Sequence, residues 1–304
     1  MVMYQVVVKG MDIIEDPTYA KYLLEYIKLI QESNEYKNNT IDKIRVDSYY
    51  VIASNCADDL TTKDFKEFGK ALEELTKSID GYNMEAEEKV SNYFTILRIY
   101  CTYATKIDSA YDRIIDISNK AQELIVNSEI AIIDASSEET TGIEYSELVS
   151  IYKTLANRLY SGAKSTSNID KQKLLYQNSI KWFELLDTYS VDLDIDLKLV
   201  KGNCYKGFFD TYDNKNSDEA KKYLNIAVDL YKAVLDENNE NFSAKVYYTQ
   251  ALLAQEKISH STGRVNEINT LYKQLLKQSS DASYTEKTLF NALKEQMKMA
   301  GLGV

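Results

Sequence analysis

Residues 216–235 read NSDEAKKYLNIAVDLYKAVL, and this stretch decides the fold. Its apolar side chains recur at positions i, i+3, i+4, i+7 and i+10, a spacing that places them on one face of a helix. They are Leu224, Ala227, Val228, Tyr231 and Val234. The polar stretch 237–241 follows at once. The segment therefore predicts an amphipathic helix that ends in a short link.

The same pattern occurs earlier in the chain. Residues 168–187 read NIDKQKLLYQNSIKWFELLD, and a shift of 48 positions aligns their apolar residues with those of 216–235. A similar set recurs later, 41 residues on from the second, at Ile268, Leu271, Tyr272 and Leu275. A repeated pair of helices cannot cover its own apolar face, so neighbouring pairs are expected to stack.

Helical periodicity extends over most of the chain. The clearest case is 62–79, where Phe65, Phe68, Leu72, Leu75 and Ile79 follow steps of three and four residues. Further helices are expected over 16–30, 41–60, 84–106, 108–130, 143–163, 168–188, 194–212, 217–237, 242–260, 263–279 and 284–299. The sequence predicts an all-α fold of about twelve helices, and the short links between them predict antiparallel neighbours.

The composition supports an all-α chain. There is one proline, Pro17, and there are ten glycines in 304 residues. Strands, hairpin turns and catalytic loops depend on these residues, so an all-β or α/β chain of this length would carry more of them. A hydrophobic content of 44% is enough to build a core and excludes general disorder.

The segment 227–235, AVDLYKAVL, resembles the second helix of a tetratricopeptide repeat. In that family a small residue lets paired helices approach closely and an aromatic residue fills the space toward the next hairpin. Ala227 and Tyr231 match those two roles. The first-helix pattern of large, small and aromatic is matched by Leu199, Gly202 and Tyr205. The resemblance is clearest over 168–280 and implies a right-handed superhelix of stacked antiparallel helical hairpins.

The chain departs from the family pattern in two respects. Its repeats are spaced by 41–48 residues, whereas tetratricopeptide repeats are spaced by about 34. The proline that commonly follows the second helix is absent, and Asn239 stands near its place. Another αα-solenoid, such as a HEAT-type array, and a non-repetitive helical bundle therefore stay open as alternatives.

One helical-repeat domain is expected over residues 1–304. Within it, 1–15 would form a tail or a short strand, and 16–280 would form the helical hairpins. The segment 284–299 is expected to be a C-terminal capping helix, because a terminal repeat needs a polar outer face. Its Leu289, Ala292 and Leu293 are expected to pack inward.

Charge and composition exclude several classes of partner. A formal charge of −11, with no basic cluster, argues against direct binding of nucleic acid. No apolar run reaches about 18 residues, so no membrane span is expected. The N-terminus lacks the features of a signal peptide. Cys56, Cys101 and Cys204 are far apart, and each lies within a helical pattern. We therefore expect them to be reduced core residues of a cytoplasmic protein.

The residues offer little for catalysis, metals or cofactors. A single histidine, His260, cannot build a histidine-rich metal site, and no phosphate-binding glycine loop is present. Asp192, Asp194 and Asp196 alternate as in calcium loops, but the glycine and downstream glutamate of such loops are missing. The favoured interpretation is a helix start, where acidic residues complement the helix dipole. We expect no enzyme, cofactor or metal site.

The tetratricopeptide resemblance implies that the first helix of each hairpin lines a groove for a peptide. Asparagine side chains can hydrogen-bond an extended backbone, and lysine or arginine can bind a carboxylate. The predicted peptide- or partner-binding residues on these helices are Asn157, Arg158, Lys201, Asn203, Lys206, Tyr247 and Tyr248.

The leading functional hypothesis is a non-enzymatic scaffold or adaptor that binds a protein or peptide partner in this groove. The alternatives are a structural or assembly subunit of a larger complex, with homo-oligomerisation possible, and a peptide-sensing regulator that lacks its own DNA-binding domain. An enzyme on a helical scaffold is a third class, and it would need paired carboxylates in a buried pocket.

Overall fold

Helices dominate the structure, a computed structural model that describes residues 17–32, 43–49, 51–52, 65–134, 141–259 and 262–302. This part of the chain contains twelve helices, which confirms the all-α class and the expected number of about twelve. The predicted tail or strand at 1–15 lies outside the described residues, as do Cys56 and His260.

The chain divides into two units, 1–154 and 155–304, and the boundary falls within helix α7 (Tyr145–Ser165). Unit 1 contains α2 (Pro17–Glu32), helical residues at 43–49 and 51–52, α4 (Phe65–Gly81), α5 (Ala86–Thr102), α6 (Ala110–Asn127), β1 (Ile132–Ile133) and β2 (Ile143–Glu144). Unit 2 contains α8 (Ile169–Thr188), α9 (Ile195–Asp210), α10 (Asp218–Glu237), α11 (Phe242–Ser259), α12 (Val265–Gln278) and α13 (Tyr284–Met299).

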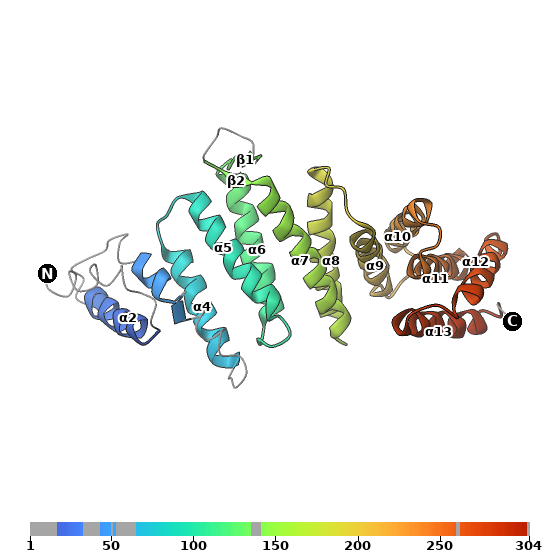
Figure 1. The fold of residues 1–304 in the computed structure, drawn as a ribbon, viewed down its shortest axis with the longest axis horizontal. Helices are drawn as coiled ribbons and strands as arrows, with labels where there is room; N and C mark the ends of the chain where they lie inside the picture. The colour runs from blue at the N-terminus through green and yellow to red at the C-terminus, as the bar shows by residue number, and fades with distance from the viewer. Residues whose placement is uncertain are drawn as a thin grey trace. The chain divides into compact units, whose positions relative to one another are not determined.

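In unit 1, α4, α5 and α6 pack in sequence order (Figure 1). The predicted apolar stripe of α4 forms part of the core, because Phe68, Leu72, Leu75 and Ile79 are all buried. Their spacing of three and four residues explains this, since it keeps all four on the face that meets α5. Polar contacts at the rim add to the packing, among them a hydrogen bond of 2.6 Å from the Tyr93 hydroxyl to Asp80.

A short parallel strand pair in unit 1 is a feature that the periodicity did not predict. Ile132 pairs with Ile143, and the Ile143 amide donates to the Ala131 carbonyl at 2.9 Å. Gly142 allows this approach, because its φ is +139° and a Cβ there would lie 2.6 Å from the Ala131 oxygen. Strands of two residues are too short to leave a readable alternation in the sequence.

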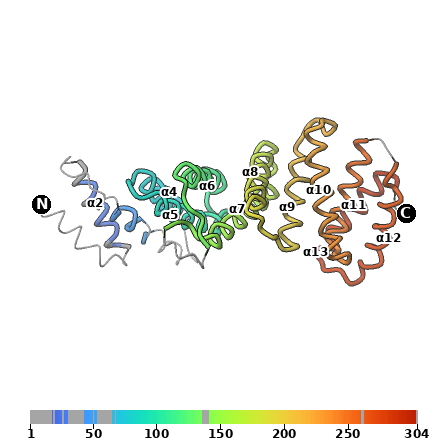
Figure 2. The backbone as a smooth tube through the Cα atoms, turned by 90° about the horizontal axis from the view of Figure 1, so that it is seen from above, coloured from blue at the N-terminus to red at the C-terminus, as the bar shows by residue number. Residues whose placement is uncertain are grey.

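In unit 2, consecutive helices pack as antiparallel hairpins in sequence order (Figure 2). Helix α8 packs on α9, α9 on α10, α10 on α11 and α11 on α12, while α13 also packs on α11. The predicted stacking of helical hairpins is confirmed. The right-handed superhelix and the single domain over 1–304 stay predictions.

The repeat of 48 residues is visible in the burial of α8 and α10. Both helices begin at a side-chain cap: Asn168 accepts from the Lys171 amide and Ser217 from the Ala220 amide. Five buried positions correspond at this offset, with Tyr176, Ser179, Ile180, Phe183 and Leu186 matching Leu224, Ala227, Val228, Tyr231 and Val234. The two helices therefore use the same face to pack in successive hairpins.

Helix α13 has the bounds predicted for a C-terminal helix. It begins with a capping box formed by Ser283 and Glu286, and its Leu293 is buried as expected. The expectation for Ala292 was wrong, because Ala292 is exposed and Phe290 is buried instead. Phe290 meets the Phe242 ring of α11 at a centroid distance of 5.8 Å, and this contact sets the rotation of the helix.

Two glycines in α9 allow tyrosine rings to pack directly against the helix backbone. A Cβ at Gly202 would lie 2.6 Å from the ring of Tyr231 on α10, and a Cβ at Gly207 would collide with the ring of Tyr176 on α8. A hydrogen in place of a methyl group is therefore required at both positions. These contacts set the spacing of α9 from α8 and α10.

We predict that Gly202→Ala and Gly207→Ala each destabilise the chain by about 1–3 kcal/mol, because the new methyl group forces the ring and helix apart. At a helical glycine with no close neighbour, the same substitution would increase the free energy of unfolding, since alanine is favoured over glycine by about 1 kcal/mol in a helix interior. Urea unfolding measures the change. Gly263→Ala is the control, because no atom lies within 4 Å of its Cβ position. A gain in stability for Gly202→Ala would contradict the contact.

Candidate functional site

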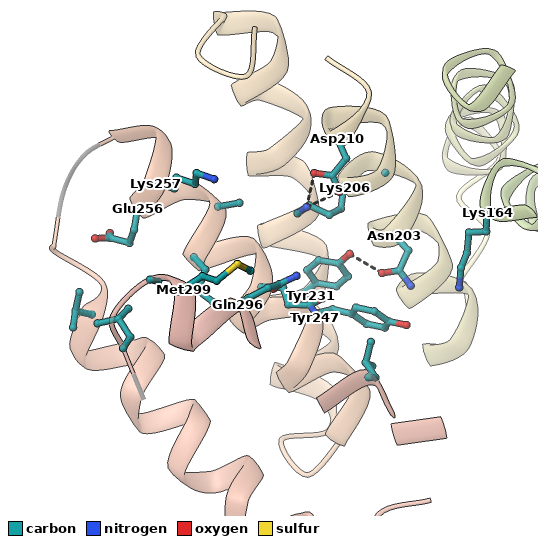
Figure 3. Close-up of a pocket in the computed structure, with 18 of the residues that line it drawn as sticks. Lys164, Asn203, Lys206, Asp210, Tyr231, Tyr247, Glu256, Lys257, Gln296 and Met299 are labelled. Atoms are coloured by element: carbon teal, nitrogen blue, oxygen red, sulfur yellow. Dashed lines mark hydrogen bonds and ion pairs between the residues drawn. The ribbon is translucent and has the colours of Figure 1, made fainter. Parts of the chain in front are cut away.

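A cleft of about 860 Å³ opens within unit 2 (Figure 3). Its lining comes from the C-terminal part of α7, from α8 to α13 and from residues that follow α13. The polar lining residues include Tyr160, Lys164, Tyr176, Asn203, Lys206, Asp210, Tyr231, Tyr247, Gln250, Glu256, Lys257 and Gln296. The apolar ones are Leu253, Ala254, Val265, Leu289, Met299, Ala300 and Leu302.

Helical spacing explains how each helix contributes a continuous stripe to the cleft. On α9, Asn203, Lys206, Gly207 and Asp210 occupy positions i, i+3, i+4 and i+7, so they share one face. The same rule aligns two residues of α7 and four of α11. These are Tyr160 and Lys164, and Tyr247, Gln250, Ala254 and Lys257.

The floor of the cleft is built by tyrosines from the second helices of the hairpins. Tyr176 of α8 and Tyr231 of α10 line the cleft, and each packs where α9 has a glycine. The Tyr231 ring also stacks on Tyr247 of α11, with centroids 5.7 Å apart and planes at 22°. Bulky aromatic groups therefore fill the space beneath the three first helices and fix the shape of the floor.

Asn203 is the polar centre of this floor. Its carboxamide oxygen accepts a hydrogen bond of 2.7 Å from the Tyr231 hydroxyl. Burial raises the pKa of Tyr160 and of Tyr247, and in both cases a hydrogen bond with Asn203 partly opposes the rise. The hydroxyl groups of Tyr160 and Tyr247 also line the cleft and can donate or accept hydrogen bonds.

Apart from Glu256, the charged side chains of the cleft fall into two groups. Lys206 and Asp210 form an ion pair on α9, with Nζ–O distances of 2.8 and 2.7 Å, so their charges offset each other. Lys164 and Lys257 are exposed and lie at opposite ends of the cleft in Figure 3. The Lys164 ammonium lies 5.4 Å from the centre of the Tyr160 ring. The cleft therefore has an ammonium group at each end.

Three of the predicted binding residues are brought together in this cleft. Asn203 and Lys206 lie on the same face of α9, and Tyr247 faces them from α11 (Figure 3). All three were chosen because they lie on first helices, and all three line the cleft. That any of them contacts a partner stays a prediction.

The other four predicted residues do not line the cleft. Lys201 is buried, and its ammonium group binds both carboxylate oxygens of Asp187 on α8 at 2.6 Å. Tyr248 is buried and donates to Glu267 at 2.8 Å. Asn157 is exposed on α7 and Arg158 is half-buried there. Lys201 and Tyr248 thus hold neighbouring helices together, and a partner role for these four residues stays a prediction.

Several cleft residues were not among the predicted ones. The sequence could have indicated three of them. Tyr160 and Lys164 have the i, i+4 spacing that places two residues on one face of a first helix, and Lys257 follows Tyr247 by ten residues, which places it on the same face of its helix. Tyr176 and Tyr231 were assigned only to packing, because they belong to second helices. The sequence contains 25 tyrosines, which indicates an aromatic surface in general but does not show which tyrosines form it.

The acidic stretch before α9 is a helix start, as favoured from the sequence. The Asp194 side chain caps the helix by accepting from the Leu197 amide at 2.8 Å, and Asp196 lies in its first turn. Asp192 pairs with Lys198 at 3.3 Å. In the described ranges, no group of three or more His, Cys, Asp or Glu is arranged to hold a metal ion.

The second of the cysteines within the described residues lies beneath this site. Cys204 on α9 is fully buried, and its sulfur lies 3.0 Å from the Ser179 oxygen of α8. Burial raises the pKa of the Cys204 thiol to about 12, so the thiol stays protonated and packs as a small apolar group.

None of the helices that the structure describes is long and apolar enough to cross a membrane.

Comparison with known proteins gives little further guidance. No family model matches the chain, and no curated protein matches it. Among solved structures, the nuclear import adaptor Nro1 of S. pombe is similar, with 95% of this chain and 96% of that chain covered. The identity is 10% and the TM-score is 0.33. At these values the likeness assigns no function to this chain.

We predict that stability falls at high pH in part through Tyr176. Burial raises its pKa to about 12, whereas an unfolded tyrosine ionises near pH 10. The stabilisation is complete below about pH 10 and is lost as the pH rises toward 12, because only the unfolded chain releases the proton there. The free energy of unfolding, measured with urea at several pH values, gives this slope.

The matched variant is Tyr176→Phe, which keeps the ring and removes the ionisable group. Its stability should fall less steeply with pH by up to about 1.4 kcal/mol per pH unit between pH 10 and 12. An unchanged slope would show that Tyr176 ionises equally easily in both states and does not lie in a buried floor.

Proposed function

We propose that this chain is a non-enzymatic scaffold that binds a protein or peptide partner, and that the partner segment occupies the cleft of unit 2. The observation that carries the proposal is the arrangement of α7, α9 and α11. Each is the first helix of a hairpin: α9 packs on α10, α11 packs on α12, and the Tyr160 ring of α7 meets the Tyr176 ring of α8. Each also turns one stripe of side chains toward the same cleft. A tetratricopeptide-like array, which the sequence resembles most clearly over 168–280, would turn its first helices toward one groove in the same way.

The lining of the cleft supports a peptide segment as the ligand. Tyrosine rings and the side chains of Leu253, Leu289 and Met299 offer apolar surface, while Asn203 and the tyrosine hydroxyls offer hydrogen bonds. Binding sites for peptides combine such apolar contact with a small number of placed polar groups. Rigid aromatic groups also cost little conformational entropy on binding. A cytoplasmic location is part of the proposal, supported by Cys101 and Cys204, which are both buried thiols among the described residues.

The cleft provides a direct test through site-specific photo-cross-linking. A photoreactive phenylalanine analogue in place of Gln250 lies in the cleft, whereas the same analogue in place of Lys232 lies on an exposed face of α10. We expect cross-linking at Gln250 in native lysate to capture a partner through one short segment. A synthetic peptide of that segment should then compete for cross-linking at Gln250.

The control position and the captured species decide among the alternatives. Equal capture of the same proteins at Lys232 would mean that the cleft is not selective and would contradict the proposal. Capture of nothing but further copies of this chain would favour the assembly-subunit alternative. A cross-linked segment whose synthetic peptide fails to compete would also count against a peptide-binding cleft.

A further inference from the structure

The charge of the cleft differs from the charge of the whole chain. The chain carries a formal charge of −11, yet the cleft lining holds three lysines and two carboxylates. Lys206 and Asp210 offset each other, and the second carboxylate, Glu256, keeps its charge while it accepts a hydrogen bond of 3.1 Å from the Arg264 backbone amide. Three lysines against two carboxylates leave the lining with a net charge of +1. A cleft in low-dielectric walls concentrates the field of its remaining charges.

Lys164 and Lys257 supply that remaining positive charge. Among the ion pairs of the described residues, none involves either ammonium group, and the Lys164 ammonium lies 5.4 Å from the centre of the Tyr160 ring. Figure 3 places Lys164 at the end of the cleft nearer Asn203 and Lys257 at the opposite end. A ligand that binds both lysines therefore extends along the cleft.

Hydrogen-bond donors line the cleft between the two lysines. The Asn203 oxygen already accepts from the Tyr231 hydroxyl, which leaves the Asn203 NH₂ group as a donor. The hydroxyls of Tyr160 and Tyr247 also line the cleft and can donate. The Tyr247 hydroxyl points toward the Lys164 end of the cleft in Figure 3. Donors beside an ammonium group favour an acceptor with negative charge, which a carboxylate provides.

We infer that the partner segment is an extended acidic peptide, with carboxylate side chains on both sides of an apolar residue. One carboxylate binds Lys164 and the neighbouring tyrosine hydroxyls, and the other binds Lys257. The apolar residue between them packs on the wall formed by Leu253, Leu289 and Met299. This inference rests on the proposed function and specifies the chemistry of its ligand.

The test uses a library of peptides of about eight residues, long enough to extend over roughly 27 Å. The peptides are N-acetylated and C-amidated, are randomised over Asp, Asn, Lys, Leu, Tyr and Ala, and are selected on the full chain. Selection should enrich peptides with Asp on both sides of Leu or Tyr. Fluorescence anisotropy then measures affinity, and replacing both Asp by Asn should weaken binding at least tenfold.

Matched variants locate the charges that are recognised. Lys164→Gln and Lys257→Gln should each weaken the selected peptide about tenfold, a change of about 1.4 kcal/mol. Lys232→Gln removes the same charge from an exposed position outside the cleft and should leave the affinity unchanged. Binding should also weaken as salt is raised, because the rim lysines are exposed to solvent. Equal losses in all three variants would reduce the effect to net charge and overturn the inference.

The remaining outcomes separate the inference from the proposed function. Selection of neutral or basic peptides that still block cross-linking at Gln250 would overturn the acidic ligand and leave the binding cleft in place. The absence of any selected peptide would contradict both. A carboxylate can also come from the C-terminus of a peptide, and a parallel library with free C-termini tests this source. Binding by members of that library alone would show that the cleft recognises a terminal carboxylate and would overturn the assignment of side-chain carboxylates.

Discussion

The packing of tyrosine rings against the glycines of α9 is the constraint on which unit 2 depends. At Gly202 and Gly207 the helix presents bare backbone, so Tyr231 and Tyr176 lie where a methyl group would collide with them. The rings thereby hold α9 to the second helices and also emerge as the floor of the cleft. The same rings therefore set both the spacing of the hairpins and the surface that a ligand meets. Protein interiors are closely packed, so a change in one of these features changes the other.

This arrangement also determines the electrostatics of the cleft. Tyr231 can reach the Asn203 carboxamide because Gly202 precedes Asn203 on the same helix, and the hydrogen bond fixes the Asn203 side chain through its oxygen. The floor then offers an amide and tyrosine hydroxyls as donors without carrying a charge of its own. The charge comes from lysines at the two ends, so shape and hydrogen bonding are set by the core while affinity for anions is set at the rim.

Much of the architecture follows from local pattern, and the site follows less completely. Steps of three and four apolar residues identify helices such as α4 and α10 because burial of one helical face is a property of a single segment. Asn203 and Lys206 were found because they share a face of a first helix. Lys201 was selected because it lies on the same first helix, but it is two residues before Asn203, about 200° around the helix. It therefore points away from the cleft and pairs with Asp187 instead. That distinction depends on the rotation of α9 against α8, which a single segment does not encode.

Direct packing of the tyrosine rings on the backbone of α9 can be measured in the unmodified chain. Nuclear Overhauser effects between the ring protons of Tyr231 and the α-protons of Gly202 report this contact, as do those between Tyr176 and Gly207. Strong effects are expected for both pairs, since each ring occupies the space a Cβ would need. Absence of both effects, with Tyr231 instead close to residues on another face of α9, would contradict the packing and the cleft built upon it.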